Sequence, residues 1–156
     1  MVAAEWLRAA LMLLHALAGA AWFGSIFYGV FVLYPRVSRH FDDIAERERL
    51  LLAMSHGARW HMIAALTLVA SSGLGLLLIP RAEISWLWLT LIGVKAALMI
   101  AGAILFWRVS WYWWPARLFA LESELPAIHR RFRIGASCML VLVGLNIALG
   151  VLTRVV

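Results

Sequence analysis

The long apolar run from Leu7 to Arg36 is the feature that most constrains how this chain can fold. A transmembrane helix needs roughly 20 apolar residues, at ~1.5 Å rise each, to cross a ~30 Å hydrocarbon core, and this run is long enough. Hydrophobic residues make up 65% of the 156-residue chain and charged residues only 14%. Soluble domains usually carry about 25% charged residues. The sequence therefore indicates an integral membrane protein.

Four apolar runs predict four transmembrane helices, with spans at about 6–34, 59–79, 86–107 and 134–156. Only the turn Pro80-Arg81-Ala82-Glu83 separates the second span from the third, so these two helices are expected to be antiparallel neighbours. No internal repeat, linker or low-complexity segment divides the chain. We therefore predict an all-α membrane protein with one domain, residues 1–156, folded as a four-transmembrane-helix antiparallel bundle.

The two longer connections are amphipathic. Asp42-Asp43 opens a helical stretch with an N-cap and early acidic residues followed by arginines. Pro115 opens a second such stretch, which we expect to be broken at Pro126. Amphipathic helices of this kind can lie on a membrane surface. The apolar residues of the first stretch that would contact it are Ile44, Leu51 and Met54.

Basic residues are distributed unevenly between the predicted connections. Ten of the fourteen lysines and arginines lie in or at the edges of the two longer connections. Cytoplasmic loops carry an excess of Lys and Arg. Both longer connections are therefore expected to face the cytoplasm, with both termini on the outer side of a bacterial inner membrane. The net charge of +6 is thus attributed to the membrane rather than to nucleic acid. The ten residues are Arg36, Arg39, Arg47, Arg49, Arg59, Arg108, Arg117, Arg130, Arg131 and Arg133.

Each predicted span carries a polar residue at a similar depth. His15 and Lys95 both lie nine residues inside the outer edge of their spans, or ~13 Å at the helical rise. Ser71 or Ser72 and Asn146 match this depth in the second and fourth spans. Ionisable groups inside a membrane are rare and usually functional. The matching depth of these four polar positions predicts an interior polar site. A hydrogen-bonded network that joins the helices is the alternative.

His15 is the predicted centre of that site. Gly19 and Trp22 follow it at i+4 and i+7 on one helix face, where the glycine leaves a notch and the tryptophan closes it. One imidazole can ligate a haem iron, with a weak or external second ligand. Lys95 and Asn146 are expected to shape the same cavity.

A second group of residues surrounds His61 at the cytoplasmic edge. His61 lies roughly 25 Å from His15 along the membrane normal, so one iron cannot bridge the two. Arginines mark the cytoplasmic ends of all four spans and form a predicted cationic ring. Such a ring can bind porphyrin propionates through bidentate pairs, and lipid phosphates are the alternative. The ring consists of Arg36, Arg59, Arg108 and Arg133.

A copper site is a further possibility. Met12 is one turn from His15, and Met99 is one turn from Lys95. Thioether sulfur together with imidazole suits Cu(I). The six methionines are scattered, however, and methionine in an apolar core commonly fills space. The single cysteine, Cys138, excludes an internal disulfide and a CxxC motif.

At these residues the chain resembles the CopD/HemJ-like group of small four-helix membrane proteins. The first span is similar in His15, then Trp22-Phe23, then Phe27-Tyr28. Arg59-Trp60-His61 resembles the basic and aromatic start of that group's second helix. Lys95, within Gly93-Val94-Lys95-Ala96, resembles its intramembrane lysine.

The resemblance implies a membrane redox protein associated with haem b, because HemJ-type members are held to be protoporphyrinogen oxidases. CopD-type members are associated with copper uptake or resistance. The chain has Leu105-Phe106-Trp107 where HemJ-type proteins carry Tyr-His, so no catalytic residue is assigned. We expect haem or porphyrin binding within the lipid bilayer. Copper handling, or a role as accessory subunit of a larger membrane complex or homo-oligomer, remains the alternative.

Overall fold

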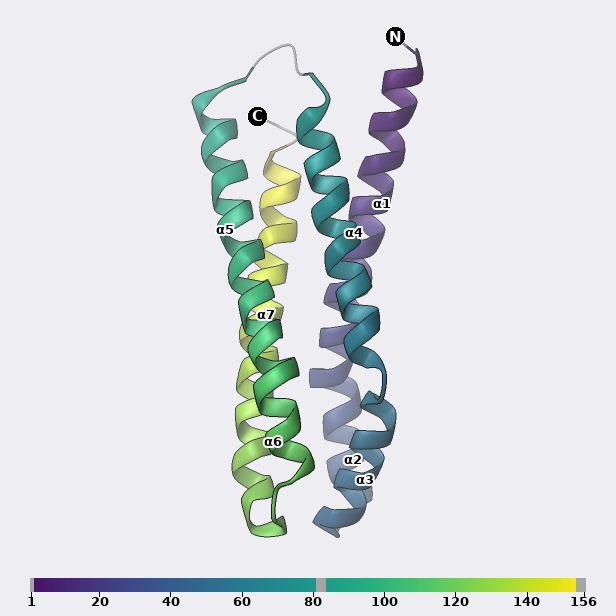
Figure 1. Cartoon of the computed structure of the whole chain (residues 1–156), viewed down its shortest axis with the longest axis vertical. Helices are drawn as coiled ribbons and strands as arrows, with labels where there is room; N and C mark the ends of the chain where they lie inside the picture. Colours follow the sequence, from purple (N-terminus) through teal and green to yellow (C-terminus); the bar gives the residue numbers. More distant parts are fainter. Residues whose placement is uncertain (1, 81–83, 154–156) are drawn as a thin grey trace.

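The computed structural model describes residues 2–80 and 84–153, and every regular element within these ranges is a helix. This confirms the predicted all-α class. Four helical stretches are long and apolar enough to cross a membrane. Both termini lie at one end of the bundle with the connection that follows the second of these stretches, whose residues 81–83 fall outside the described ranges (Figure 1). The four long helices are α1 (Val2–Phe27), α4 (Ala58–Leu78), α5 (Trp86–Arg108) and α7 (Leu125–Leu152).

Two of the long helices continue through a proline by widening into a π-helix. The π-helical segment η1 (Tyr28–Leu33) joins α1 to α2 (Tyr34–His40), and η2 (Val109–Trp113) joins α5 to α6 (Trp114–Leu118). The helices therefore extend beyond the predicted span ends, to His40 and Leu118.

The prolines explain why the helix widens there. A proline has no N–H to donate, and its ring clashes with the carbonyl four residues earlier. Pro35 and Pro115 each follow a residue whose N–H reaches five residues back instead of four. The Tyr34 N–H donates to the Gly29 carbonyl, and the Trp114 N–H donates to the Val109 carbonyl. The wider turn separates the ring from the preceding carbonyls and lets the helix continue.

The connections at the opposite end are short helices. Helix α3 (Ile44–Ser55) begins after Asp43, whose side chain accepts a hydrogen bond from the Ala45 N–H at 2.9 Å, as the predicted N-cap requires. The prediction that Pro126 breaks the second connection is wrong. Pro126 lies in the first turn of α7, where its missing N–H has no helical partner to lose.

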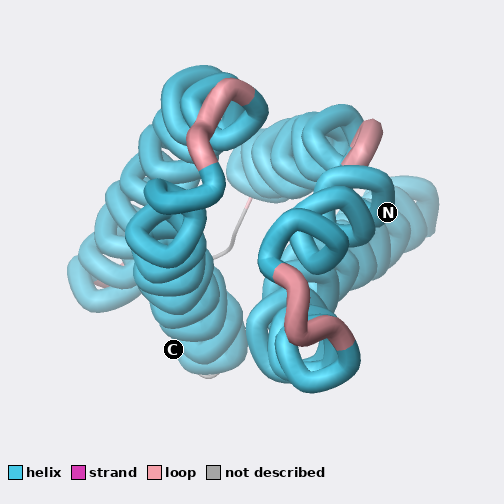
Figure 2. Tube along the Cα trace, turned by 90° about the horizontal axis from the view of Figure 1, so that it is seen from below, coloured by secondary structure: helices cyan, strands magenta, loops and turns pink. Residues whose placement is uncertain are grey.

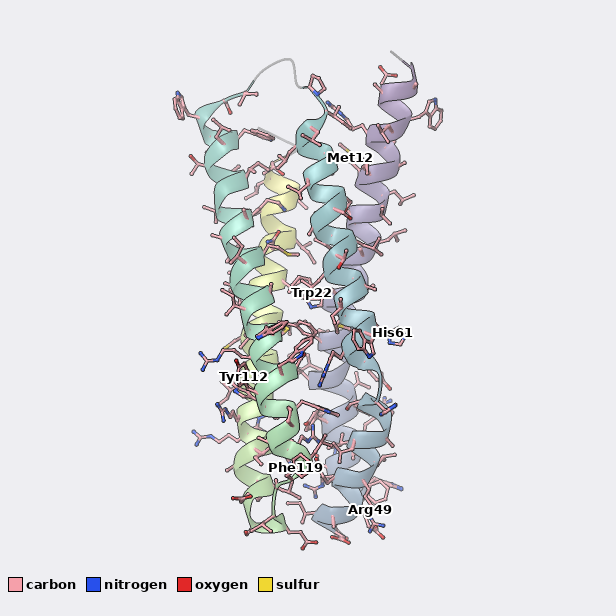
Figure 3. The ribbon with its side chains drawn as sticks, in the orientation of Figure 1. Met12, Trp22, Arg49, His61, Tyr112 and Phe119 are labelled. Carbon is pink, nitrogen blue, oxygen red and sulfur yellow. The ribbon has the colours of Figure 1, made fainter. Side chains whose placement is uncertain are left out.

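The long helices pack as two pairs, α1 with α4 and α5 with α7, and α1 also contacts α7. Figure 2 shows the bundle from the α2–α3 end, where short loops join the helices. The core between the pairs consists of Trp22, Phe106, Met139 and Val143. Trp22 lies at mid-height of the bundle (Figure 3) and is only 3% exposed. Many large apolar side chains point outward instead, as expected for helices that contact lipid.

Candidate functional site

His15 forms a pair with Ser72 between α1 and α4. The distance from His15 Nδ1 to Ser72 Oγ is 3.0 Å, and Ser72 is 1% exposed. The Ser72 hydroxyl donates to the Leu68 carbonyl, so Nδ1–H of His15 is the donor to Ser72. Gly73 lets the ring approach, because a Cβ there would lie 3.2 Å from His15 Cε1. The imidazole is thus held in one orientation between α1 and α4.

Lys95 forms a second pair with Asn146 between α5 and α7. Its Nζ donates to the Asn146 backbone carbonyl at 2.9 Å and to Oδ1 at 3.2 Å. Asn146 Nδ2 donates in return to the Lys95 carbonyl at 2.8 Å. A Cβ at Gly150 would lie 2.9 Å from Nζ, so the glycine makes room for the amine. The structure arranges the predicted polar residues as two pairs, one in each helix pair.

The remaining residues predicted near His15 lie in different surroundings. Trp22 packs in the core, where a Cβ at Gly102 would lie 3.3 Å from its ring. Met99 packs against the same core, whereas Met12 lies closer to the terminal end of the bundle (Figure 3). A Cβ at Gly19 would meet no atom within 4 Å. Among the described residues, no three His, Cys, Asp or Glu side chains gather as a metal-binding group.

His61 and the predicted cationic ring lie at the opposite end of the long helices. His61 is exposed on the outer side of α4 (Figure 3), with Nδ1 3.3 Å from the Gly57 carbonyl. The guanidinium of Arg59 stacks over the Trp111 ring at 4.8 Å and is half-buried. The other three arginines of the ring are exposed: Arg36, Arg108 and Arg133.

A buried ionic cluster joins the two connections at this end. Arg117 of α6 donates to both carboxylate oxygens of Glu48 on α3, from Nε at 2.5 Å and from Nη2 at 2.9 Å. His129 Nε2 of α7 lies 2.6 Å from Glu48 Oε2. Glu48 is 7% exposed and Arg117 is 3% exposed. We call these three residues the Glu48 cluster.

Electrostatics keep the Glu48 carboxylate ionised. Burial alone would raise the pKa of Glu48, but hydrogen bonds and charges from His129 and Arg117 outweigh burial and lower this pKa to about 2. Aromatic rings surround the guanidinium, with Phe132 at 5.2 Å and Trp114 at 5.6 Å from Arg117 Cζ. Bidentate and stacked contacts of this kind are specific to arginine.

The Glu48 cluster is not predicted from the sequence. Its partners are 69 and 81 residues away from Glu48 along the chain. One signal is available: Glu48 follows Ile44 at i+4 and precedes Leu51 at i+3, so its carboxylate lies on the apolar face of α3. Leu51 is 1% exposed, which shows that this face is buried.

A cavity of about 410 Å³ lies beside the Glu48 cluster and extends toward the core. Its inner wall is apolar and includes Ile26 and Phe106. Its other walls carry cations and soft donor atoms, and Tyr34 and Arg117 also line it. The volume is in the range of small-molecule sites, roughly 300–1,000 Å³. Besides Arg117, the lining residues with cationic or soft donor groups are His56, Arg59, Met62, Arg133 and Met139.

Comparisons of the chain with protein-family models, curated proteins and solved structures found no match. The features of the molecule that point to a function are therefore the two polar pairs, the Glu48 cluster and the cavity.

Proposed function

We propose that the chain is a multi-pass protein of a bacterial inner membrane that binds haem b or a related porphyrin and takes part in membrane redox chemistry. Four helices of sufficient length and apolarity support membrane insertion as an antiparallel bundle. The arginine-rich connections support a cytoplasmic location for α2, α3 and α6, with both termini outside.

The observation that carries this proposal is the cavity beside the Glu48 cluster. A porphyrin is an apolar plane with carboxylates along one edge, and the cavity pairs an apolar wall with Arg59 and Arg133. Guanidinium groups bind carboxylates in bidentate fashion. His56 and the thioethers of Met62 and Met139 also line the cavity, and imidazole and thioether are both ligands of haem iron. The donor set therefore fits the group.

The geometry favours His56 over His15 as the residue that would hold the haem iron in this cavity. His15 does not line it and lies between α1 and α4 beside Ser72. The Nδ1 hydrogen bond to Ser72 resembles the support that metal-binding histidines usually receive, so His15 remains the candidate for a site at the outer level. A bound haem would supply one-electron chemistry. The chain would bind the carboxylates, orient the ring and exclude water.

An absorption spectrum of the detergent-purified protein tests the proposal. We expect a Soret band that is lost or shifted in His56→Ala and kept in His61→Ala, because His61 is exposed and does not line the cavity. Loss of the Soret band in His15→Ala alone would assign the haem to the level of His15. A colourless protein that shows no Soret shift when reconstituted with haem would overturn haem binding.

The arginines offer a matched pair of variants. Arg59→Gln removes a guanidinium from the cavity lining, whereas Arg108→Gln removes an exposed one at the same end. We expect weaker haem retention during gel filtration only in Arg59→Gln. Equal retention in the two variants would argue against propionate binding in this cavity.

A second candidate function is Cu(I) handling, because one imidazole and two thioethers line the same cavity. It predicts copper in the purified protein by elemental analysis. The copper content should fall in Met62→Leu if the cavity is the site, and in Met12→Leu if copper binds near His15. Protein that takes up no copper from a Cu(I) buffer would remove this candidate.

A further inference from the structure

The corner between α3 and α4 forms one wall of the cavity. Consecutive residues from Ser55 to Trp60 line the cavity, and Gly57 is at their centre. Gly57 has φ +77°, and it is the only residue with positive φ among those the structure describes. This left-handed conformation favours glycine because a Cβ makes it unfavourable. The corner between α3 and α4 therefore differs in backbone conformation from the rest of the described chain.

Helix α3 is tied to the far side of the cavity through Glu48. Arg117, which binds the Glu48 carboxylate, itself lines the cavity. His129 binds the same carboxylate from α7. The polar tie between the first connection and the second thus lies directly beside the cavity.

We propose that α3 is a lid on this cavity, hinged at Gly57 and latched by the bonds from Glu48 to Arg117 and His129. When the latch is closed, Ser55 and His56, at the end of α3, are held against the cavity. When the latch is released, α3 swings about Gly57 and carries these two residues away, which opens the cavity at the α2–α3 end. This inference concerns access to the site of the proposed function, but it depends on the cavity and not on the identity of its ligand.

Thiol labelling tests the lid without any cofactor. In a Cys138→Ser background, Ser110→Cys places a reporter in the cavity lining at a position that is 6% exposed. The rate of reaction with iodoacetamide, followed by mass spectrometry, measures opening. We expect Glu48→Gln to raise this rate at least about tenfold, because removing one partner of a buried ion pair costs more than the ~1.4 kcal/mol that corresponds to tenfold.

Two controls separate opening from general loosening. Glu46→Gln removes an exposed carboxylate from the same helix and should leave the rate unchanged. Ala18→Cys, in the same Cys138→Ser background, places a thiol at a buried position of α1 that does not line the cavity, and it should react equally fast with and without Glu48→Gln. Ala136→Cys provides a second reporter in the lining of the cavity. Where Glu48→Gln does not fold, His129→Gln removes one of the two partners and should give a smaller rise.

Unchanged labelling of both reporters in a folded latch variant would overturn the lid. An equal rise at position 18 would overturn it too, because the whole bundle would then be loosened. If the labelling rate rises only at the reporters and the protein never binds haem, the result would support the lid and overturn haem binding. The lid and the proposed function can therefore fail separately.

Discussion

The polar residues at the level of His15 and Lys95 and those at the α2–α3 end accommodate buried charge in different ways. Near the terminal end, Lys95 donates to the backbone carbonyl and the side-chain amide oxygen of Asn146 on α7. At the α2–α3 end, a carboxylate, a guanidinium and an imidazole are bound together. Hydrogen bonds between membrane helices average only about 0.6 kcal/mol, whereas breaking a buried ion pair costs about 3–5 kcal/mol. Charge therefore stabilises the α2–α3 end, whereas packing with modest polar contacts stabilises the level of Lys95.

The largest effect should follow from removing the carboxylate of the Glu48 cluster. Glu48→Ala leaves the Arg117 guanidinium buried without its acceptor, and we expect a loss of about 3–5 kcal/mol in the free energy of unfolding. Unfolding in mixed detergent micelles measures it. The control is Glu46→Ala on the same helix, where an exposed site should change by less than about 0.5 kcal/mol. Equal losses of unfolding free energy in Glu48→Ala and Glu46→Ala would show that buried charge does not stabilise the α2–α3 end.

Acid should weaken the α2–α3 end through the same carboxylate. The pKa of Glu48 is lowered from 4.5 to about 2 by His129 and Arg117, against burial. Because the folded-state pKa is depressed, the stabilisation is complete above pH ~4.5 and is lost as the pH falls toward 2. A shift of this size corresponds to roughly 3 kcal/mol. Unfolding measured from pH 6 to pH 2.5 should show the loss, and Glu48→Gln should flatten the curve. An unchanged slope in Glu48→Gln would assign the acid sensitivity to other groups.

Substitutions of Lys95 and of Asn146 should change the stability unequally. Lys95→Met removes an amine that is costly to bury and should leave the stability unchanged or improve it. Asn146→Leu leaves that amine with fewer acceptors and should cost about 1–2 kcal/mol. The comparison of the two variants in mixed micelles is the test. A larger loss in Lys95→Met than in Asn146→Leu would show that the charge itself holds this region together.

The smallest effect should come from the His15–Ser72 pair. Ser72→Ala removes the acceptor of the imidazole, and we expect a loss of about 0.6 kcal/mol, with a maximum near 1.7 kcal/mol. Ser71→Ala is the matched control, because Ser71 is exposed and donates only to the carbonyl of Leu68 in its own helix. A loss above 3 kcal/mol in Ser72→Ala would place this pair with the Glu48 cluster in strength.

Local patterns predicted the features that depend on neighbouring residues. The length of the apolar runs predicted the four long helices, and Asp43 predicted the start of α3. The depth of polar residues selected Lys95, Asn146 and either Ser71 or Ser72, because the helical rise converts sequence position into level. The structure identifies Ser72 as the partner of His15. Their division into two pairs was not predicted, since equal depth does not specify which helices are adjacent.

The features that the sequence did not reveal depend on long-range contacts or on unusual backbone geometry. Glu48 and His129 are 81 residues apart, so their contact requires the relative placement of two connections. The sequence predicts that the first and third spans end at about residues 34 and 107 and that Pro115 opens a separate helical stretch. The continuous helices became evident only from the π-helical hydrogen bonds of Tyr34 and Trp114.

The two π-helical segments also determine how the chain tolerates changes of length. A π-turn is equivalent to an α-turn with one residue inserted, and each residue of an α-helix turns the chain by about 100°. Because the wide turn absorbs its extra residue, a one-residue deletion in η2 would restore α-helical winding and keep the Arg117 side chain toward Glu48. A one-residue deletion within α5 would instead rotate α6 by about 100° and turn that side chain away. A substitution in η2 at an exposed position, such as Tyr112→Phe, leaves the winding intact. The angular position of the arginine is thus encoded in the number of residues before it as well as in their identity.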